Sequence, residues 1–274
     1  MNVNINLIIS IFNLPFSNYL PGFIRKKLLK NNKITFIPTH LKSLPKKKYP
    51  VLFSQKEHEE IYRNYVKTNK ISFNTFEEIK IILNKKYKKE EHFNFLDFGG
   101  EKIDFYLNIV KEFKNINYYI INLPQINKDL QFLKEKYNLQ NIFILKNLDE
   151  LKSKKFDFVY FGSTIQYIHN YTEVLNNLLP LIKKHIFFSA THFFENNDKI
   201  KNIVVKQLNY LPAEYHLYFI NLDNFLADLA KFDFEVQFNQ INKTYKYNTE
   251  VFKNFNLNNL KYTDIFFEKK INFS

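Results

Sequence analysis

The chain has 274 residues, a formal net charge of +13 at neutral pH and no cysteine. Its length suits one large sheet domain with a smaller appended region, and the lack of cysteine excludes disulfides, thiolate zinc sites and cysteine nucleophiles. Nearly all of the positive charge is lysine, since Arg25 and Arg63 are the only arginines. Because arginine makes the bidentate contacts to phosphates and base edges, this composition argues against specific nucleic-acid recognition. The surplus lysine fits a solvated surface, with weak association to an anionic membrane surface as the alternative.

Residues 1–90 are expected to form an N-terminal extension that is irregular at first and then helical. Prolines recur up to Pro50 and a basic cluster occupies 46–48, so no core is expected in this part. The apolar run 7–12 has no basic residue before it and is too short to span a membrane, so we predict neither a signal peptide nor an anchor, and a cytoplasmic location. Apolar residues at helical spacing predict helices over 57–66 and 75–86, placed to lid a ligand site.

The stretch from Phe93 to Tyr106 is the most informative part of the chain. An apolar run stops at Asp97, a glycine pair follows at Gly99 and Gly100, and a helical pattern begins after it. This order predicts a strand, a tight turn and a helix N-terminus. Glycines at such a turn let a ligand approach the backbone, and the helix start offers unpaired N–H groups. A purely structural turn is the alternative.

Further apolar runs alternate with helical patterns along the rest of the chain. This alternation predicts βαβ units and a doubly wound, mostly parallel α/β sheet over residues 91–274, covered on both faces. A last helix and two further strands are expected toward the end of the chain. The expected strands cover 118–122, 142–145, 156–161, 185–190, 234–239 and 262–268, and the expected helices cover 102–113, 125–137, 172–184 and 222–232.

Polar residues follow several of these strands, where a doubly wound sheet binds nucleotide-like ligands. Asn122 ends the second run at the separation where nucleotide-binding folds place a ribose-binding side chain. Ser163, Thr164 and Gln166 follow the fourth run, and they either contact a ligand or satisfy helix N-terminal N–H groups.

Histidines are the candidates for acid–base work. His192 lies just beyond the fifth run and is the first candidate for a general base, because an imidazole titrates near neutral pH. His169 is the second, and a structural histidine is the alternative for both. The seven histidines show no ligand spacing, so no metal site is predicted.

These motifs resemble those of class I S-adenosylmethionine-dependent methyltransferases. The resemblance covers roughly residues 49–247 and is carried by Leu96-Asp-Phe-Gly-Gly100, Phe161-Gly-Ser-Thr-Ile-Gln-Tyr-Ile168 and Val205-Lys-Gln-Leu-Asn-Tyr-Leu-Pro212. More narrowly, the chain is similar to a bacterial group of proposed methyltransferases from surface-polysaccharide and lipopolysaccharide gene clusters. It departs from the class I pattern where residues 101–103 stand in place of a third glycine and Asn122 replaces the ribose-binding acid.

The resemblance implies a Rossmann-like class I methyltransferase fold with S-adenosylmethionine as cofactor. It implies methyl transfer to a sugar or glycan-linked acceptor in polysaccharide biosynthesis, the acceptor being a small molecule or a nucleotide- or lipid-linked glycan. Asp97 and Tyr167 would lie near the cationic sulfonium, with ordering of the turn as the alternative for Asp97. Residues 191–221 would form an acceptor-side insertion where Tyr210 and Tyr215 either stack on a sugar or pack in the core. Asn147 and Leu148 would border the adenine. The expected cofactor-binding residues are Asp97, Phe98, Gly99, Gly100, Asn122, Leu123, Asn147, Leu148, Ser163, Thr164, Gln166 and Tyr167.

Two other classes of function stay open. A catalytically silent Rossmann-like binding or scaffold domain is favoured by Asn122 and the missing glycine, and a basic protein that binds nucleic acid or a membrane surface is favoured by charge alone.

The effect of an amide at position 122 can be expressed as an energy. A neutral hydrogen bond contributes about 0.5–1.5 kcal/mol and one to a charged group about 1.5–3. The amide of Asn122 is therefore expected to weaken cofactor binding by roughly tenfold without abolishing it.

Overall fold

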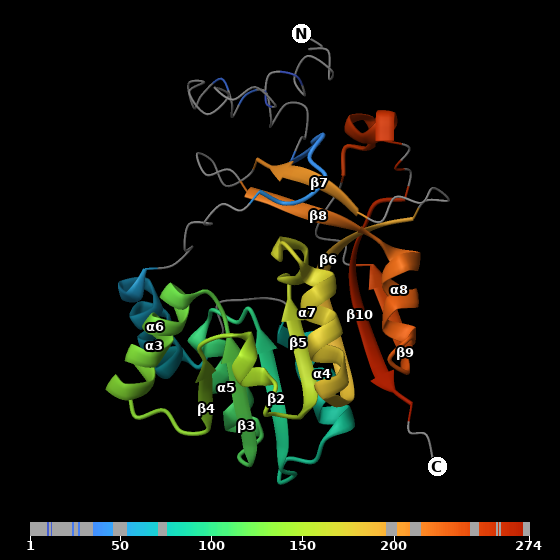
Figure 1. The fold of residues 1–274 in the computed structure, drawn as a ribbon. Coiled ribbons are helices and arrows are strands. Elements are labelled where there is room, and N and C mark those ends of the chain that lie inside the picture. The colour runs from blue at the N-terminus through green and yellow to red at the C-terminus, as the bar shows by residue number, and fades with distance from the viewer. Residues whose placement is uncertain are drawn as a thin grey trace.

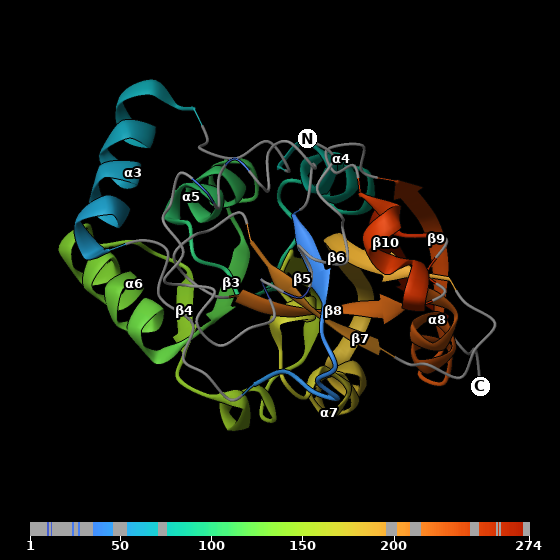
Figure 2. The ribbon, with the colours of Figure 1, turned by 90° about the horizontal axis from the view of Figure 1, so that it is seen from above.

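The structure is a computed structural model that describes residues 10, 12, 24, 27, 35–45, 54–70, 76–195, 202–208, 215–241, 247–255, 257 and 259–270. These residues form a mixed β-sheet with helices on both faces (Figures 1 and 2). The predicted doubly wound α/β architecture is therefore confirmed. No helix in the described ranges combines the length and the apolar character needed to cross a membrane.

The main part of the sheet is a run of parallel strands closed on one side by two antiparallel ones. In spatial order the strands are β4 (Ile142–Leu145), β3 (Ile116–Ile121), β2 (Phe93–Phe98), β5 (Phe156–Gly162), β6 (Ile182–Phe194), β10 (Lys261–Lys269) and β9 (Phe234–Ile241). Each neighbouring pair from β4 to β6 is parallel, and β10 lies antiparallel between β6 and β9.

Each face of this sheet buries its own hydrophobic core. Helices α4 (Phe76–Lys86), α5 (Ile103–Glu112) and α6 (Pro124–Lys136) cover one face, and α7 (Tyr171–Leu178) and α8 (Leu222–Ala230) cover the other. Helix α3 (Gln55–Thr68) packs outside α5 and α6 (Figure 2). Aromatic rings fill the centre of the sheet; Phe95, for example, stacks on Phe158 at 5.4 Å between ring centroids. Burying such a side chain fully contributes about 1.5–3 kcal/mol.

The helix predicted over 172–184 is shorter in the structure. Helix α7 ends at Leu178, the turn η4 (Leu179–Leu181) follows, and β6 begins at Ile182. Pro180 explains the early end, because its ring fixes φ and removes a backbone donor. Short 3-10 turns also occur at η2 (Leu148–Leu151), η3 (Ile165–Tyr167) and η5 (Thr249–Phe255).

A small antiparallel sheet continues the main one beyond the end of β6. Strands β7 (Asn202–Gln207) and β8 (Tyr215–Asn221) pair with each other, β8 pairs with the last two residues of β6, and β1 (Phe36–Pro38) pairs with β7. Figure 1 shows these strands above the carboxyl ends of the parallel strands. The described parts of residues 191–221, which were expected to form an acceptor-side insertion, therefore consist mainly of the end of β6 and of β7 and β8. Tyr210 lies outside the described residues, and Tyr215 is buried on β8.

The expectation that the first 50 residues contain no core was wrong. Phe12, Phe36, Ile37 and Leu44 are all at most 3% exposed. The first three share a hydrophobic cluster with buried residues of β7 and β8, and Leu44 belongs to the core that α7 and α8 cover. The burial comes from pairing between remote segments, which local composition does not reveal. The basic cluster 46–48 lies outside the described residues.

Candidate functional site

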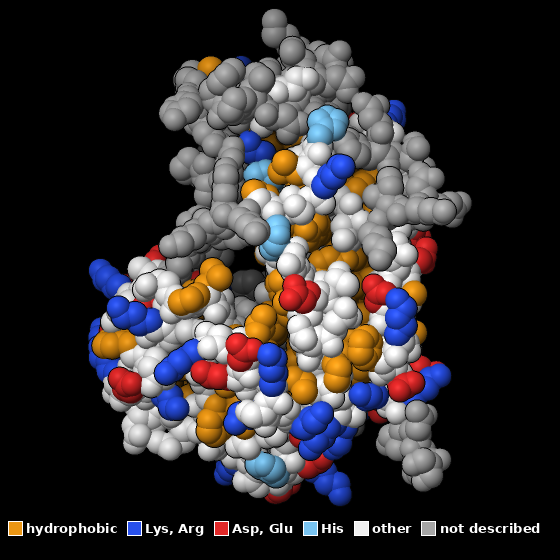
Figure 3. Space-filling model, viewed as in Figure 1, with side chains coloured by type: hydrophobic (Ala, Val, Ile, Leu, Met, Phe, Trp, Pro, Cys, Tyr) orange, Lys and Arg blue, Asp and Glu red, His pale blue; other side chains and the backbone are white. Residues whose placement is uncertain are grey.

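The carboxyl ends of the three central strands share an unusual backbone geometry. Gly99 after β2, Ser163 after β5 and Ala190 in β6 have φ values of +83°, +54° and +53°. The other described residues with positive φ are asparagine or aspartate, which tolerate this region well. A left-handed serine and alanine on neighbouring strands mark a place where the backbone is strained, and strain of this kind clusters at functional sites. On the face shown in Figure 3, the surface is hollowed above the carboxyl ends of β2 and β3.

Side chains of the protein itself occupy the space beside both glycines of the turn after β2. The Gly99 N–H donates to the Ile121 carbonyl at 2.8 Å, which fixes the turn against β3. A Cβ at Gly99 would lie 2.3 Å from Thr164 Cγ2, and one at Gly100 would lie 2.1 Å from Asp97 Oδ2. The turn therefore requires glycine at both positions for its own packing, whether or not a ligand binds there.

Asp97 is a buried carboxyl at the end of β2. It is 4% exposed, and the Tyr118 hydroxyl donates a hydrogen bond to its Oδ2 at 2.6 Å. Burial raises the pKa of Asp97 to about 7, and the hydrogen bond from Tyr118 opposes this shift. No described lysine, arginine or histidine pairs with the carboxyl. The neighbouring Phe98 is part of the core, where its ring stacks on Phe161 at 4.8 Å.

Asn122 links the end of β3 to the glycine turn. Its Nδ2 donates to the Gly100 carbonyl at 2.7 Å, and its Oδ1 accepts from the Leu123 N–H at 2.7 Å. Asn127 on α6 holds the Asn122 backbone by hydrogen bonds at 3.0 Å in both directions and also donates to the Leu145 carbonyl at 2.8 Å. A carboxylate at position 122 could not donate to Gly100, so the amide has a structural use that an acid would lack.

The ends of β3 and β4 carry exposed apolar side chains. Leu123 and Leu148 are 46% and 43% exposed at neighbouring strand ends. Asn147 caps η2, since its Oδ1 accepts from the N–H groups of Asp149 and Glu150 at 3.0 and 3.2 Å. The leucines are therefore available to a flat apolar ligand, whereas the Asn147 side chain serves the local turn.

The turn after β5 is held by side chains of its own. Gln166 is fully buried, and its Nε2 donates to Ser163 Oγ at 3.0 Å and to the Ala190 carbonyl at 3.2 Å. Its Oε1 has no hydrogen-bond partner among the described residues. Thr164 Oγ1 donates to the Gly162 carbonyl at 2.9 Å. A buried acceptor without a donor costs about 1–3 kcal/mol, which makes this turn a place where a ligand donor would be favoured.

Tyr167 and the two candidate histidines lie toward the small sheet. The Tyr167 hydroxyl donates to Gln207 Oε1 of β7 at 2.8 Å. His192 is 2% exposed among aromatic rings of β1, β8 and β10, with its Nδ1 2.6 Å from the Tyr247 hydroxyl. Burial lowers the pKa of His192 to about 3. The reason for choosing His192, an imidazole that titrates near neutral pH, does not hold in this environment.

His169, in contrast, is partly exposed, and a hydrogen bond fixes which of its ring nitrogens carries the proton. The His169 Nδ1 is 2.7 Å from the Leu44 carbonyl oxygen, and the backbone carbonyl of His169 accepts a hydrogen bond from the Tyr218 hydroxyl at 3.0 Å. Because a carbonyl only accepts, Nδ1 carries the proton and Nε2 is the basic nitrogen. The side chain is partly exposed, and no described residue bonds to Nε2.

The predicted residues thus fall into two groups. The structure brings together the glycine turn, Asn122 and Thr164 at the ends of β2, β3 and β5, whereas His192 lies apart in an aromatic core. Sequence reasoning missed Tyr118 and Asn127. An amide beside the apolar positions of the helix predicted over 125–137 is a signal for Asn127, but only strand pairing shows that Tyr118 faces Asp97.

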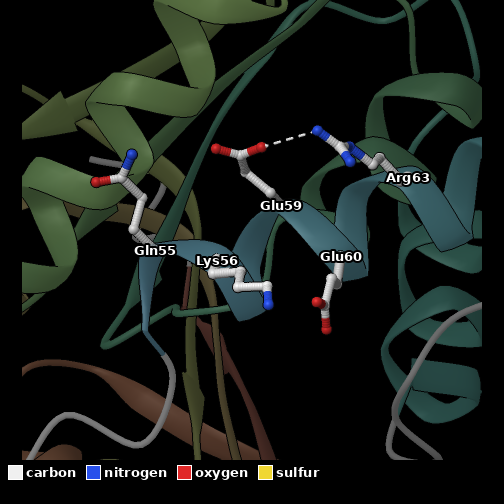
Figure 4. Close-up of a pocket in the computed structure, with 5 residues that line it drawn as sticks. All are labelled: Gln55, Lys56, Glu59, Glu60 and Arg63. Atoms are coloured by element: carbon white, nitrogen blue, oxygen red, sulfur yellow. Dashed lines mark hydrogen bonds and ion pairs between the residues drawn. The ribbon is translucent and has the colours of Figure 1, made fainter.

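A separate surface hollow lies on α3 and includes none of the predicted site residues. Figure 4 shows this hollow of about 450 Å³ on α3, lined by Gln55, Lys56, Glu59, Glu60 and Arg63. Glu59 accepts a hydrogen bond from Arg63 at 3.2 Å, and a solvent-screened pair of this kind contributes little to stability. Every lining residue belongs to one outer helix, so the strand ends contribute nothing to it.

Comparisons with known proteins bear on the fold. No protein-family model and no curated protein matches the sequence. A proposed sarcosine dimethylglycine methyltransferase from Galdieria sulphuraria is similar in structure, with a TM-score of 0.52 at 12% identity over 72% of this chain and 85% of that one. A proposed S-adenosylmethionine-dependent methyltransferase from Listeria monocytogenes has a TM-score of 0.48 at 12% identity over 70% and 97% of the two chains. The magnesium protoporphyrin IX methyltransferase from Synechocystis PCC 6803 has a TM-score of 0.48 at 10% identity over 98% and 100%. The first similarity confirms the Rossmann-like class I methyltransferase fold, and at this identity it shows the fold alone.

Proposed function

We propose that the protein is an S-adenosylmethionine-dependent methyltransferase that binds its cofactor at the carboxyl ends of β2, β3, β4 and β5. One observation carries the proposal: a buried carboxyl, Asp97, lies under the glycine turn without a described cationic partner. A buried charge is costly unless it is paired. A cationic ligand at this turn would supply the missing partner, in a fold whose ligands bind at this edge.

The residues at this edge suit the parts of such a cofactor. Asp97 suits a cationic centre, the unpartnered Gln166 Oε1 suits an ammonium or hydroxyl donor, and the exposed Leu123 and Leu148 suit an adenine ring. Asn122 suits the ribose, although its amide already donates to Gly100. When bound, S-adenosylmethionine supplies an electrophilic methyl group on a sulfonium.

Methyl transfer by direct displacement asks the protein mainly for alignment. Ideal positioning of donor and acceptor contributes up to about 7–11 kcal/mol to the rate. Where the acceptor must lose a proton, we propose His169 as the base, because its Nε2 is the basic nitrogen and no described residue bonds to it. His192 is the second candidate, since a group with a pKa of about 3 is a weak base at neutral pH.

The acceptor side of the proposal rests on the sequence resemblance. We propose a sugar or a nucleotide- or lipid-linked glycan as acceptor, within surface-polysaccharide biosynthesis in the cytoplasm. The motif Val205-Lys-Gln-Leu-Asn-Tyr-Leu-Pro212, which carries part of the resemblance, begins on β7 above the strand ends. A nucleic-acid function has less support, because basic and acidic side chains are interspersed on the face in Figure 3.

A silent binding domain is the second candidate. It is favoured by the Thr164 side chain, which fills the space beside Gly99, and by the hydrogen bond that Asn122 makes to Gly100. Equilibrium dialysis with S-adenosylmethionine, paired with transfer of a labelled methyl group to a panel of nucleotide sugars and lipid-linked glycans, separates the two. Binding with label transfer supports the enzyme. Binding without transfer to any acceptor favours the silent domain, and no binding contradicts both the cofactor and the enzyme.

In the same assay, His169→Gln is expected to lower transfer by about 10²–10⁴, the usual contribution of a positioned base. His192→Gln is the matched variant and should cost far less in the chemical step. Equal losses in both variants would contradict the choice of His169.

A further inference from the structure

Asp97 and Tyr118 form a closed pair under the glycine turn. Tyr118 is 0% exposed and Asp97 is 4% exposed, and the phenol donates to the carboxyl at 2.6 Å. Asp97 Oδ2 also lies against Gly100, in the space that a Cβ would take. Anything that binds over the turn is therefore separated from this carboxyl by a residue without a side chain.

The titratable groups around the pair are phenols. Tyr160 of β5 lies opposite Asp97 in the strand register, and Tyr106 of α5 packs on Tyr118 at 5.2 Å between ring centroids. No described cation from β2, β3, β5 or α5 acts on Asp97, whose pKa of about 7 reflects burial opposed by the Tyr118 hydrogen bond. Near neutral pH the free protein therefore contains this carboxyl in both protonation states.

A positive charge bound beside a carboxyl favours its ionised form. Building on the proposed function, we propose that binding of S-adenosylmethionine expels a proton from Asp97, and that Tyr118 is the positioning residue that sets the pH at which this occurs. Cofactor affinity then rises with pH and levels off once Asp97 is ionised in the free protein. Below that point it weakens by up to about tenfold per pH unit.

Calorimetric titration of the full chain with S-adenosylmethionine, in two buffers of different ionisation enthalpy, counts the protons released. At about pH 6 the wild type should release about one proton per cofactor more than Asp97→Asn, which keeps an acceptor for Tyr118 but cannot ionise. The difference should shrink at about pH 8, where Asp97 is already ionised. Subtracting the Asp97→Asn value removes the contributions of the histidines and of the amino group of the ligand.

Tyr118→Phe tests the positioning role. Loss of its hydrogen bond should raise the pKa of Asp97 further, so the pH at which affinity levels off should move upward. A structural role alone would lower affinity equally at every pH. Tyr119→Phe is the matched control, because it removes a phenol hydroxyl from the same strand without touching Asp97 and should leave the profile unchanged.

A second measurement needs no ligand. The raised pKa means that the folded state holds the Asp97 proton more tightly than the unfolded state does. The stability that this proton gives is present below pH 3.8 and is lost as the pH rises toward 7, so wild type should lose stability relative to Asp97→Asn across that range.

The outcomes separate the two proposals. Cofactor binding with equal proton release in wild type and Asp97→Asn overturns the proton linkage and leaves the methyltransferase proposal intact. No binding at any pH overturns the methyltransferase proposal, and the linkage with it. An unchanged pH profile in Tyr118→Phe overturns the role of Tyr118.

Discussion

The two halves of the sheet's carboxyl edge are built in different ways. The half proposed to bind the cofactor, here called the cofactor half, is formed by the ends of β2, β3, β4 and β5. It is a set of short turns held together by hydrogen bonds, such as the one that the Asn122 side chain donates to the Gly100 carbonyl. The half proposed to face the acceptor, here called the acceptor half, is formed by the end of β6 with β1, β7 and β8. It is an aromatic core in which His192 is buried. Residue type alone thus indicates chemistry in the first half, whereas in the second half burial by remote segments decides what a residue can do.

The largest effect is expected at Gly99. Gly99→Ala forces a side chain into left-handed backbone, which costs about 1–3 kcal/mol, and drives its Cβ into Thr164, which costs about 1–3 more. Urea denaturation should show a loss of about 2–6 kcal/mol in the free energy of unfolding. Adding Thr164→Gly to the Gly99→Ala protein should recover only the part of the unfolding free energy that the clash with Thr164 costs. Gly162→Ala is the milder control, since φ is not positive there and the nearest atoms to the new Cβ belong to the Tyr160 side chain, at 2.8–3.0 Å.

A stable Gly99→Ala protein that merely fails to bind cofactor would contradict this prediction. It would restore the simpler view in which the glycine serves ligand approach alone.

The pH dependence of stability tests whether His192 is buried in the acceptor half. Its pKa is about 3 in the folded protein against an ordinary 6.5, so the unfolded chain takes up a proton first as the pH falls. The stability due to neutral His192 is present above pH 6.5 and is lost as the pH falls toward 3, by about 5 kcal/mol in all. His192→Phe should therefore have a shallower acid limb in a plot of unfolding free energy against pH. Equally steep limbs would show that the imidazole is not buried as described.

The smallest effect is expected at Asn122 and concerns affinity. Asn122→Asp removes the donor to Gly100 and places a carboxylate against that carbonyl, so cofactor affinity should fall by roughly tenfold, or about 1.4 kcal/mol. Asn147→Asp is the matched control, because aspartate caps a helix start as well as asparagine does. Tighter binding by Asn122→Asp would instead support the sequence-based view that an acid is preferred at the ribose.

Much of the fold could be predicted from the sequence because its signals are local. Strands β2, β3 and β5 are continuous apolar runs, and α5 and α6 show regular helical spacing. Strands β1, β7 and β8 could not be predicted, since polar residues such as Lys206 and His216 interrupt their apolar patterns. Their pairing also joins remote segments, as when the Thr39 hydroxyl donates to the Val204 carbonyl.

The site was predictable in position and less so in detail. Strand ends located the turn at Gly99 and the amide at Asn122. That Asp97 faces a phenol and that His192 is enclosed by aromatic rings depend on which strands pair and on which face each residue lies. One sequence gives neither directly, so the roles assigned by residue type stay predictions, and the structure changes the environment assumed for His192.

Amide hydrogen exchange of the full chain, measured with and without S-adenosylmethionine, reports where the cofactor binds. We expect the cofactor to slow exchange in the turns at 98–104 and 121–125, at the ends of β2 and β3. Exchange in β1, β7 and β8 should change little, since these strands belong to the acceptor half. Protection confined to those three strands, or no protection at 98–104, would contradict the assignment of the cofactor to the glycine turn.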